Sequence, residues 1–214
     1  MVELEFRSCD LRFGLHIPSA HLAKLVRACE KAGSFETGGI LVGYYTSEHD
    51  YAIVSNFSGP PSDSRTGSTW FHRGIRALQE WLHLLWLRKT HYYLGEWHFH
   101  PYGDPDPSPT DIEQMESISR SEKYRCPEPV LVVVGPTLKP IRARAFVFPM
   151  GSPYLELHLV KSGVHAMRCL GSAPSKRSLE QTQTRRDDWM KQARFAAQIE
   201  PLARQMYHRG TGLR

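Results

Sequence analysis

The sequence predicts an α/β or α+β protein, a mixed sandwich in which helices flank a mixed β-sheet. Two apolar runs of strand length follow one another across a short polar turn, which is typical of a hairpin. Stretches with helical spacing alternate with further strand-like runs. Helices and strands in this order favour a sandwich over a doubly wound sheet. The 214 residues, 41% of them hydrophobic, suffice for one core of ordinary size plus an appendage.

The N-terminal part predicts a helix followed by a hairpin. Within residues 20–32 the apolar side chains recur at helical spacing, and Gly33 ends the helix. Residues 38–45 and 51–57 are strand-like runs joined by a polar turn at 46–50. These two runs predict an antiparallel pair.

A loop and a long helix are predicted next. Residues 59–67 are rich in Gly, Pro and Ser, as loops are. A long amphipathic helix should follow and end near Lys89, because five apolar residues keep the helical period: Phe71, Ile75, Leu78, Leu82 and Leu85.

The second half predicts a strand, a loop, a helix and three further strands. Residues 92–98 form a strand-like run that leads into 101–109, where Pro and Asp are too dense for a regular element. A helix over about 110–121 follows, with Pro109 in its first turn and Ser108 as its cap. The last strands are expected at 130–135, 141–148 and 154–160.

The chain divides into a domain over 1–170 and a basic, helical tail over 171–214. Residues 171–176 resemble a linker, and the tail beyond has only a loose helical stripe. From Gly171 onward nine Lys or Arg stand against four Asp or Glu, which equals the whole net charge of +5. Because the first 170 residues are near neutral and no reading motif is recognisable, nucleic acid is an unlikely partner.

Composition also bears on location and on metal ligands. No apolar run reaches the roughly 18 to 20 residues needed to cross a bilayer, and the first residues lack a signal-peptide core. We therefore expect a cytoplasmic protein without a membrane partner. The four cysteines form no C-x-x-C pair, so no cysteine zinc site is expected.

A candidate metal site lies in the segment His98-Phe99-His100-Pro101 and the helix that follows it. On a strand, His98 and His100 point to the same side, because side chains alternate with period two. Asp111, in the first turn of the next helix, can reach the same point with a carboxylate oxygen. Two imidazoles and one carboxylate, with a water in the fourth position, form an open catalytic zinc site. Bound zinc can bring the pKa of such a water to about 7.

A hydrolytic site also needs a proton acceptor and an oxyanion donor. Glu36, at the entry to the strand that begins near Gly38, is the candidate general base. Ser108 would lie beside the ion, where its hydroxyl can donate to the oxyanion of a tetrahedral intermediate. Ser108 could also serve only as a helix cap, and the two roles are compatible.

These residues resemble the JAMM motif of the MPN-plus (JAB) domain, the fold of metal-dependent deubiquitinases. The pattern is Glu36, then His98-x-His100, seven residues, Ser108, two residues and Asp111. The match holds residue by residue. It implies a mixed sheet flanked by helices, of the MPN/JAB, cytidine deaminase-like kind.

The flanking segments are similar to bacterial members of that family, the Prok-JAB type. Residues 36–43 and 93–97 carry this similarity, and the resemblance covers about residues 5–165. Phe99 departs from the family, which usually has Ser or Thr there. Because Phe99 lies between the ligands and faces away from the metal, we expect a change in packing and no loss of activity.

The resemblance implies a zinc-dependent isopeptidase that cuts the bond after the C-terminus of a ubiquitin-like protein, by deconjugation or precursor processing. Bacterial domains of this type often accompany activating and conjugating enzymes, frequently in antiphage defence systems. Three alternatives stay open: a non-catalytic MPN scaffold, a peptidase acting on a sulfur carrier or another C-terminal adduct, and an isopeptidase whose substrate is an immune enzyme conjugated through its own C-terminus.

Three further residues carry weaker predictions. Glu96 shares the ligand side of its strand and could support the ligands, although a polar residue at a strand end is an equal alternative. Trp81 and Trp86 lie within the predicted long helix, and we interpret them as packing residues more than as a binding surface.

Overall fold

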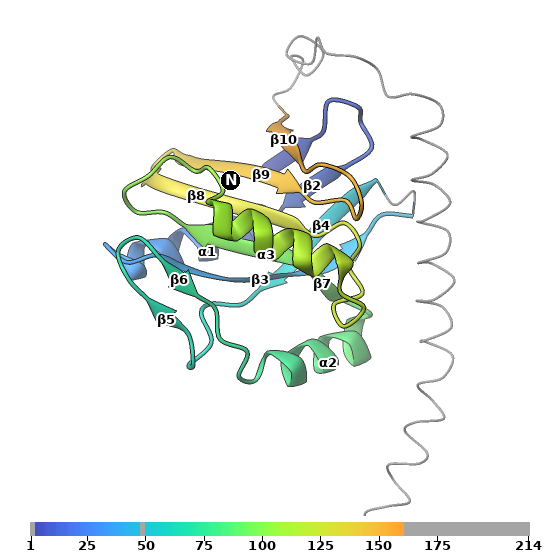
Figure 1. Ribbon diagram of the computed structural model, residues 1–214, viewed down its shortest axis with the longest axis horizontal. Helices are drawn as coiled ribbons and strands as arrows, with labels where there is room; N and C mark the ends of the chain where they lie inside the picture. Colours follow the sequence, from blue (N-terminus) through green and yellow to red (C-terminus); the bar gives the residue numbers. More distant parts are fainter. Residues whose placement is uncertain (1–2, 48–49, 161–214) are drawn as a thin grey trace, which may run out of the picture. The chain divides into compact units, whose positions relative to one another are not determined.

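The computed structural model describes residues 3–47 and 50–160 (Figure 1). The predicted tail over 171–214, with its linker, lies outside the described residues. No helix in the described part of the chain is long and apolar enough to span a membrane.

Eight strands form a closed, mixed sheet. Their order is β1-β10-β9-β8-β7-β3-β4-β2, and β1 pairs with β2 to close it. β2 and β4 are parallel, as are β7 and β8, and all other neighbours are antiparallel. The strands are β1 (Leu4–Arg7), β2 (Gly14–Ile17), β3 (Thr37–Tyr45), β4 (Tyr51–Phe57), β7 (Tyr92–Phe99), β8 (Val130–Leu138), β9 (Ile141–Val147) and β10 (Leu155–Leu159).

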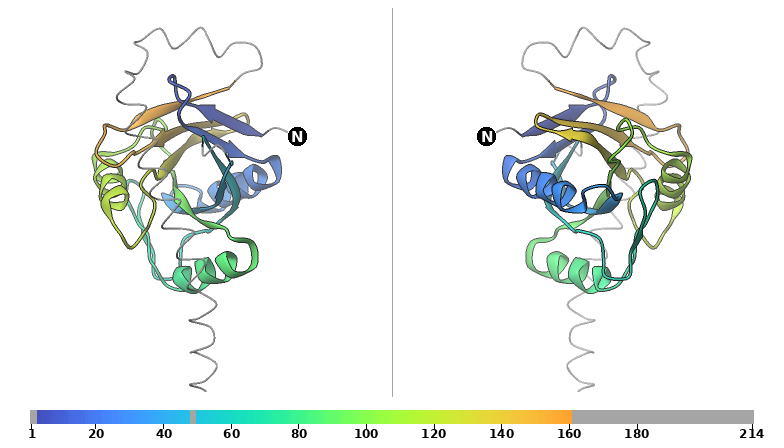
Figure 2. Two further views of the ribbon diagram at one scale, coloured as in Figure 1. Left: turned by 90° about the vertical axis from the view of Figure 1, so that its right-hand side faces the viewer. Right: turned by 90° about the vertical axis from the view of Figure 1, so that its left-hand side faces the viewer.

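Three helices cover the sheet: α1 (Ser19–Ala32), α2 (Leu78–Lys89) and α3 (Pro109–Arg120). The views in Figure 2 place α1 and α3 on opposite flanks of the sheet. Alternate residues of β8 enter two different cores, because side chains alternate along a strand. Val132 joins the core that contains residues of α1, whereas Val133 joins the core of α2 and α3.

The predicted class, a mixed sheet flanked by helices, is confirmed. The sequence did not predict β1 and β2, which close the sheet. Each is only four residues long, too short for a periodic pattern to stand out. The predicted hairpin is the β3–β4 pair.

The predicted long helix is wrong in its first part. α2 begins only at Leu78, and Phe71–His72 instead form β6, which pairs with β5 (Arg65–Thr66) in a separate two-stranded sheet. Residues 59–67, predicted as a loop, therefore contain a short strand.

Side chains of this segment hold its backbone in a non-helical path. The Asp63 carboxylate accepts the backbone N–H groups of Ile75 and Arg76, and Ser64 Oγ accepts that of Gly74. Such local bonds compete with the helical ones. The apolar period from Phe71 onward therefore does not mark one helix face: Phe71 packs on His98 from a strand, whereas Ile75 is 72% exposed.

Candidate metal centre

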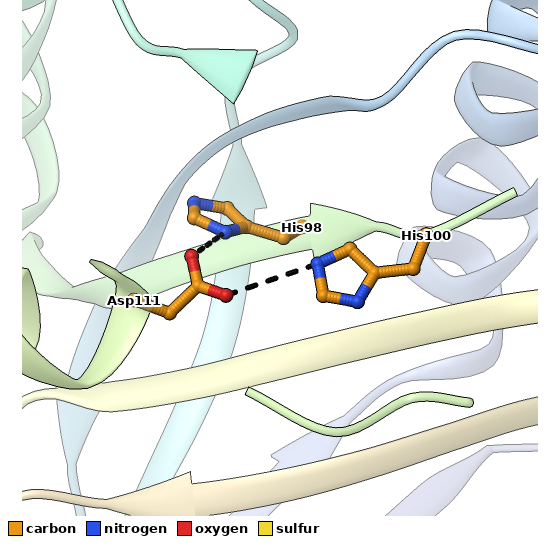
Figure 3. Close-up of side chains that lie close together, drawn as sticks. All are labelled: His98, His100 and Asp111. Carbon is orange, nitrogen blue, oxygen red and sulfur yellow. Dashed lines mark ion pairs between the residues drawn. The ribbon is translucent and has the colours of Figure 1, made fainter. Parts of the chain in front are cut away.

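The two histidines of the candidate site lie at the end of β7. Gly38 of β3 pairs with His98, and the backbone N–H of His100 donates to Val134 O at 2.8 Å, so the chain keeps a strand-like path past the end of β7. Asp111 lies in the first turn of α3. Figure 3 shows the carboxylate of Asp111 between the two imidazole rings.

The three side chains converge closely enough to share one ion. His98 Nδ1 lies 2.7 Å from Asp111 Oδ1, and His100 Nε2 lies 3.8 Å from Asp111 Oδ2. One donor atom from each residue falls within 4.8 Å of the others. Ligands of tetrahedral zinc, bound at about 2.0–2.2 Å, lie roughly 3.4 Å apart, so a small movement would bring all three to one ion. The set therefore fits zinc in donor type and in spacing.

Ser108 fixes the orientation of Asp111. The backbone N–H and the hydroxyl of Ser108 donate to Asp111 Oδ2 at 2.8 Å and 2.7 Å, and Ser108 Oγ accepts the Asp111 N–H at 3.2 Å. This is a capping box at the start of α3, with Pro109 in the first turn, so the predicted cap is confirmed. The hydroxyl proton of Ser108 is directed at the carboxylate that would bind the metal.

The electrostatics of the site suit a cation. Burial disfavours a charged His98, but Asp111 at 2.7 Å and the negative charge of nearby Glu96 outweigh it and raise the pKa of His98 to about 9. Burial also opposes ionisation of Asp111, yet His98 and Ser108 hold its pKa at about 2. Burial lowers the pKa of His100 and so favours the neutral imidazole, the form that binds metals.

Glu36, the predicted general base, directly precedes β3. Its backbone N–H donates to Gly67 O at 2.8 Å, and its carbonyl accepts the hydroxyl of Thr66, which fixes the backbone on both sides. Burial, and then the charge of Asp111, raise the pKa of the half-buried Glu36 carboxyl, while His98 offsets part of the rise. The carboxyl group therefore lies within electrostatic range of the candidate ligands.

The β5–β6 pair packs against the site. The ring of Phe71 meets that of His98 edge to face, with centroids 5.8 Å apart. A Cβ at Gly38 would lie 2.5 Å from Trp97 O, 2.8 Å from His98 Cδ2 and 2.9 Å from Phe71 Cε1. Glycine at position 38 thus permits the close approach of β3, β7 and β6 around the His98 ring.

Glu96 lies beneath His98 and is fully buried. Arg73, whose side chain is only 8% exposed, donates to Glu96 Oε1 through Nη2 at 2.8 Å and Nε at 3.1 Å. The Tyr93 hydroxyl at 3.3 Å and Gln114 Nε2 at 3.0 Å donate to the same carboxylate. Burial opposes ionisation of Glu96, but the nearby His98 ring and the Arg73 guanidinium outweigh it and lower the pKa of Glu96.

His98 Nε2 is buried without a hydrogen-bond partner and lies 3.6 Å from Glu96 Oε2. One nitrogen of this ring therefore faces Asp111 while the other faces Glu96. Carboxylates beside ligating histidines orient the imidazole and raise its basicity. Sequence analysis named Glu96 but not Arg73 or Gln114. A carboxylate in the middle of a largely apolar strand is expected to need polar or cationic partners, and this could have prompted a search for them.

We expect Arg73→Ala to destabilise the protein strongly. Removing one partner of a buried ion pair costs about 3–5 kcal/mol, because Glu96 is left as an uncompensated buried charge. Urea unfolding followed by circular dichroism measures the change. Arg76→Ala is the matched control in an exposed position of the same segment and should cost about 0.5 kcal/mol or less. Equal losses in the two variants would contradict this account of the pair.

Known proteins are similar to this chain over the region that builds the site. Residues 18–147 match the family of prokaryotic homologues of the JAB domain. A protein from Enterobacter hormaechei subsp. hoffmannii named "CD-NTase/cGAS isopeptidase" is 41% identical over 133 residues, which cover 62% of this chain and 73% of that protein. "Probable metalloprotease y4qB" from Sinorhizobium fredii is 26% identical over 125 residues, covering 55% of this chain and 73% of that protein.

Among solved structures, the solution structure of protein DSY2949 from Desulfitobacterium hafniense is similar at 14% identity and a TM-score of 0.49, covering 71% of this chain and 96% of that one. The family match spans more than half of the chain and includes Glu36, His98, His100, Ser108 and Asp111. This chain belongs to the prokaryotic JAB-domain family.

Proposed function

We propose that this chain is a zinc-dependent isopeptidase that hydrolyses the bond after the C-terminal residue of a conjugated protein. The observation that carries the proposal is the convergence of His98, His100 and Asp111 at one point, with Glu36 directly before the strand that pairs with the histidine strand. The 41% identity to a protein named an isopeptidase supports the reaction class.

His98, His100 and Asp111 would hold the metal, leaving a fourth position open as catalytic zinc sites do. The donor set and the convergence of its atoms within 4.8 Å of one another support this assignment. Zinc supplies Lewis-acid polarisation and lowers the pKa of water to about 7. Two imidazoles and one carboxylate suit zinc better than manganese or iron.

Glu36 acts as general base in this proposal. Its carboxylate accepts a proton from the water that attacks the scissile carbonyl, and then returns it to the departing lysine or peptide nitrogen. A raised pKa favours both transfers, because it brings the carboxyl group nearer to neutral pH. Hydrogen bonds to Gly67 and Thr66 fix the backbone from which the Glu36 side chain extends.

Ser108 donates its hydroxyl to the oxyanion of the tetrahedral intermediate. In the structure this proton goes to Asp111, so donation to substrate requires an exchange of acceptor. As a metal ligand, the Asp111 carboxylate would accept this hydroxyl proton less strongly, so the hydroxyl could turn to the substrate. The backbone N–H of Ser108 then still holds the carboxylate in position.

For the substrate, we favour a conjugate formed through the C-terminus of a CD-NTase/cGAS-type immune enzyme, one of the variants that the sequence left open. The name of the Enterobacter hormaechei relative supports this choice over a free ubiquitin-like protein or a sulfur-carrier adduct. Activating and conjugating enzymes of the same operon would form the conjugate in the cytoplasm, as part of antiphage defence. A non-catalytic scaffold would not need the five motif positions to be filled.

Metal analysis tests the ligand set. We expect about one zinc per purified chain, and loss of that zinc in His98→Ala, His100→Ala and Asp111→Ala, because each removes one of three protein ligands. His72→Ala is a control, since His72 is exposed and outside the set. Mass spectrometry gives the metal content. Zinc retained in Asp111→Ala, or absent from the wild type, would argue against the assignment.

Cleavage assays on Glu36→Gln separate the base from the ligands. This variant should bind zinc normally and lose at least about 10²-fold in kcat, because general-base catalysis contributes about 10²–10⁴-fold. Two substrates are compared: a lysine side chain joined to the C-terminus of a CD-NTase, and the same lysine joined to the C-terminus of a ubiquitin-like protein. Faster cleavage of the CD-NTase conjugate supports the proposed substrate, and faster cleavage of the other conjugate supports a ubiquitin-like protein as the substrate. No cleavage of either by zinc-loaded protein would count against both.

A further inference from the structure

Residues 101–108, hereafter the ligand loop, connect His100 to the helix that carries Asp111. The ligand loop has no regular secondary structure. It therefore lacks the repeated backbone hydrogen bonds that hold β7 and α3 in shape. Its two ends determine how far apart two of the three proposed ligands lie. Whatever holds the ligand loop thus bears directly on the metal centre.

The middle of the ligand loop packs on β8. Pro105 is buried, whereas Asp104 and Asp106 on either side of it are exposed. A Cβ at Gly135 would lie 3.3 Å from Pro105 Cδ and 3.7 Å from Gly103 O, so a larger residue there would crowd the loop. Apolar contacts are non-directional. The packing of Pro105 therefore does not by itself fix the backbone on either side of it.

Two arginines of β9 hold the acidic residues that flank Pro105. Arg142 and Arg144 are two positions apart, so they project from the same side of the strand. Arg142 Nη2 lies 2.9 Å from Asp104 Oδ1, and Arg144 Nη1 pairs with Asp106 Oδ1. The side chains of the Asp104 pair are 60% and 64% exposed, and pairs this exposed contribute little to stability.

Arg144 differs from Arg142 because the rest of its guanidinium group is already held. Its Nε and Nη2 both donate to the carboxylate of Glu156 on β10, each at 2.8 Å. Its Cζ lies 5.2 Å from the centre of the buried Phe146 ring. A bidentate pair has a fixed geometry. Arg144 therefore loses little further side-chain freedom when Nη1 binds Asp106.

We infer that Arg144 is a positioning residue for the metal centre. Through Asp106 it fixes the ligand loop, and so the placement of the helix that carries Asp111 relative to the strand that carries the histidines. β8 also holds the start of the loop, since Val134 O accepts the backbone N–H of His100 at 2.8 Å. The inference rests on the proposed function and adds to it a residue outside the JAMM motif.

The zinc affinity of the full chain, measured by competition with a chromophoric chelator, tests this role. Arg144→Gln and Asp106→Asn should each weaken zinc binding about 10-fold. This is the lower end of the range for loss of a side chain that supports a metal ligand, because Arg144 acts one step further out. The double variant should bind no more weakly than either single variant, since both remove the same ion pair. Asp106→Glu keeps a carboxylate for Arg144 and should bind zinc like the wild type.

The sign of the effect separates positioning from charge. By charge alone, Arg144→Gln removes a positive charge near the site and should tighten the binding of a cation, whereas Asp106→Asn should weaken it. Positioning predicts weaker binding in both variants. The control is Arg120→Gln, which breaks an exposed pair with Glu116 in the last turns of α3 and should leave zinc affinity unchanged.

Hydrogen–deuterium exchange of the full chain reports on the ligand loop itself. The backbone N–H groups of His100 and Ser108, at the two ends of the loop, are both hydrogen-bonded. In Arg144→Gln and Asp106→Asn the segment between them should exchange faster than in the wild type. Exchange in α1, on the opposite flank of the sheet, should stay unchanged and so shows that the variants are folded.

Three results would overturn the inference and leave the isopeptidase proposal intact: zinc binding in Arg144→Gln that is unchanged or tighter, losses that add in the double variant, and unchanged exchange in the ligand loop. A wild type that binds no zinc would overturn the metal assignment and this inference with it. The two failures are distinguishable, because the second appears in the unaltered chain.

Discussion

The candidate site depends on the antiparallel pairing of β3 with β7. This pairing sets Gly38 opposite His98, and so brings Glu36, directly before β3, near ligands that lie more than sixty residues away along the chain. The approach is close because position 38 has no side chain, as the crowding around a Cβ there indicates. A register shift of one residue would turn both histidines to the other face of the sheet and separate base from ligands. The geometry of the site is therefore a property of the sheet.

The polar groups beneath the site stabilise it because they are mutually satisfied. Glu96 is fully buried, and a lone carboxylate at that position would be costly. Arg73, Tyr93 and Gln114 reach it from the segment before α2, from β7 and from α3. Each group attaches a different part of the chain to the strand that carries the histidines. The β5–β6 segment is thus held against the site by a buried ion pair as well as by apolar packing.

Much of the site could be predicted from the sequence because the positions of its ligands follow from short-range rules of secondary structure. The alternation of a strand brings His98 and His100 to one side, and the Ser108 cap places Asp111 in a first turn; both follow from short-range rules. The distance from Glu36 to the histidines could not be derived that way, and its prediction depended on a family resemblance. The roles of these residues as base and ligands stay predictions.

The predictions that failed concern contacts between distant segments. Periodicity alone extended a helix back to Phe71, although this residue packs on His98 from a short strand. The periodic pattern indicated correctly that Phe71 is partly buried, but it could not indicate which residue Phe71 packs against. Trp81 and Trp86, interpreted as packing residues, do pack, on the core of α2 and α3 and on the ring of Tyr92, but both stay half-buried. For α2, counting apolar residues therefore overestimates how much of the helix its own core covers.

The capping box at α3 links stability to the proposed chemistry. Ser108 Oγ accepts the backbone N–H of Asp111, and an N-cap bond of this kind is worth about 1 kcal/mol to a helix. The oxyanion role proposed for its hydroxyl is worth roughly 3–4 kcal/mol in the transition state. The two roles do not compete over the whole cycle, because the backbone N–H can keep the carboxylate in place while the hydroxyl turns to the substrate. A helix start is thus a suitable position for a residue that must hold a ligand and serve the reaction in turn.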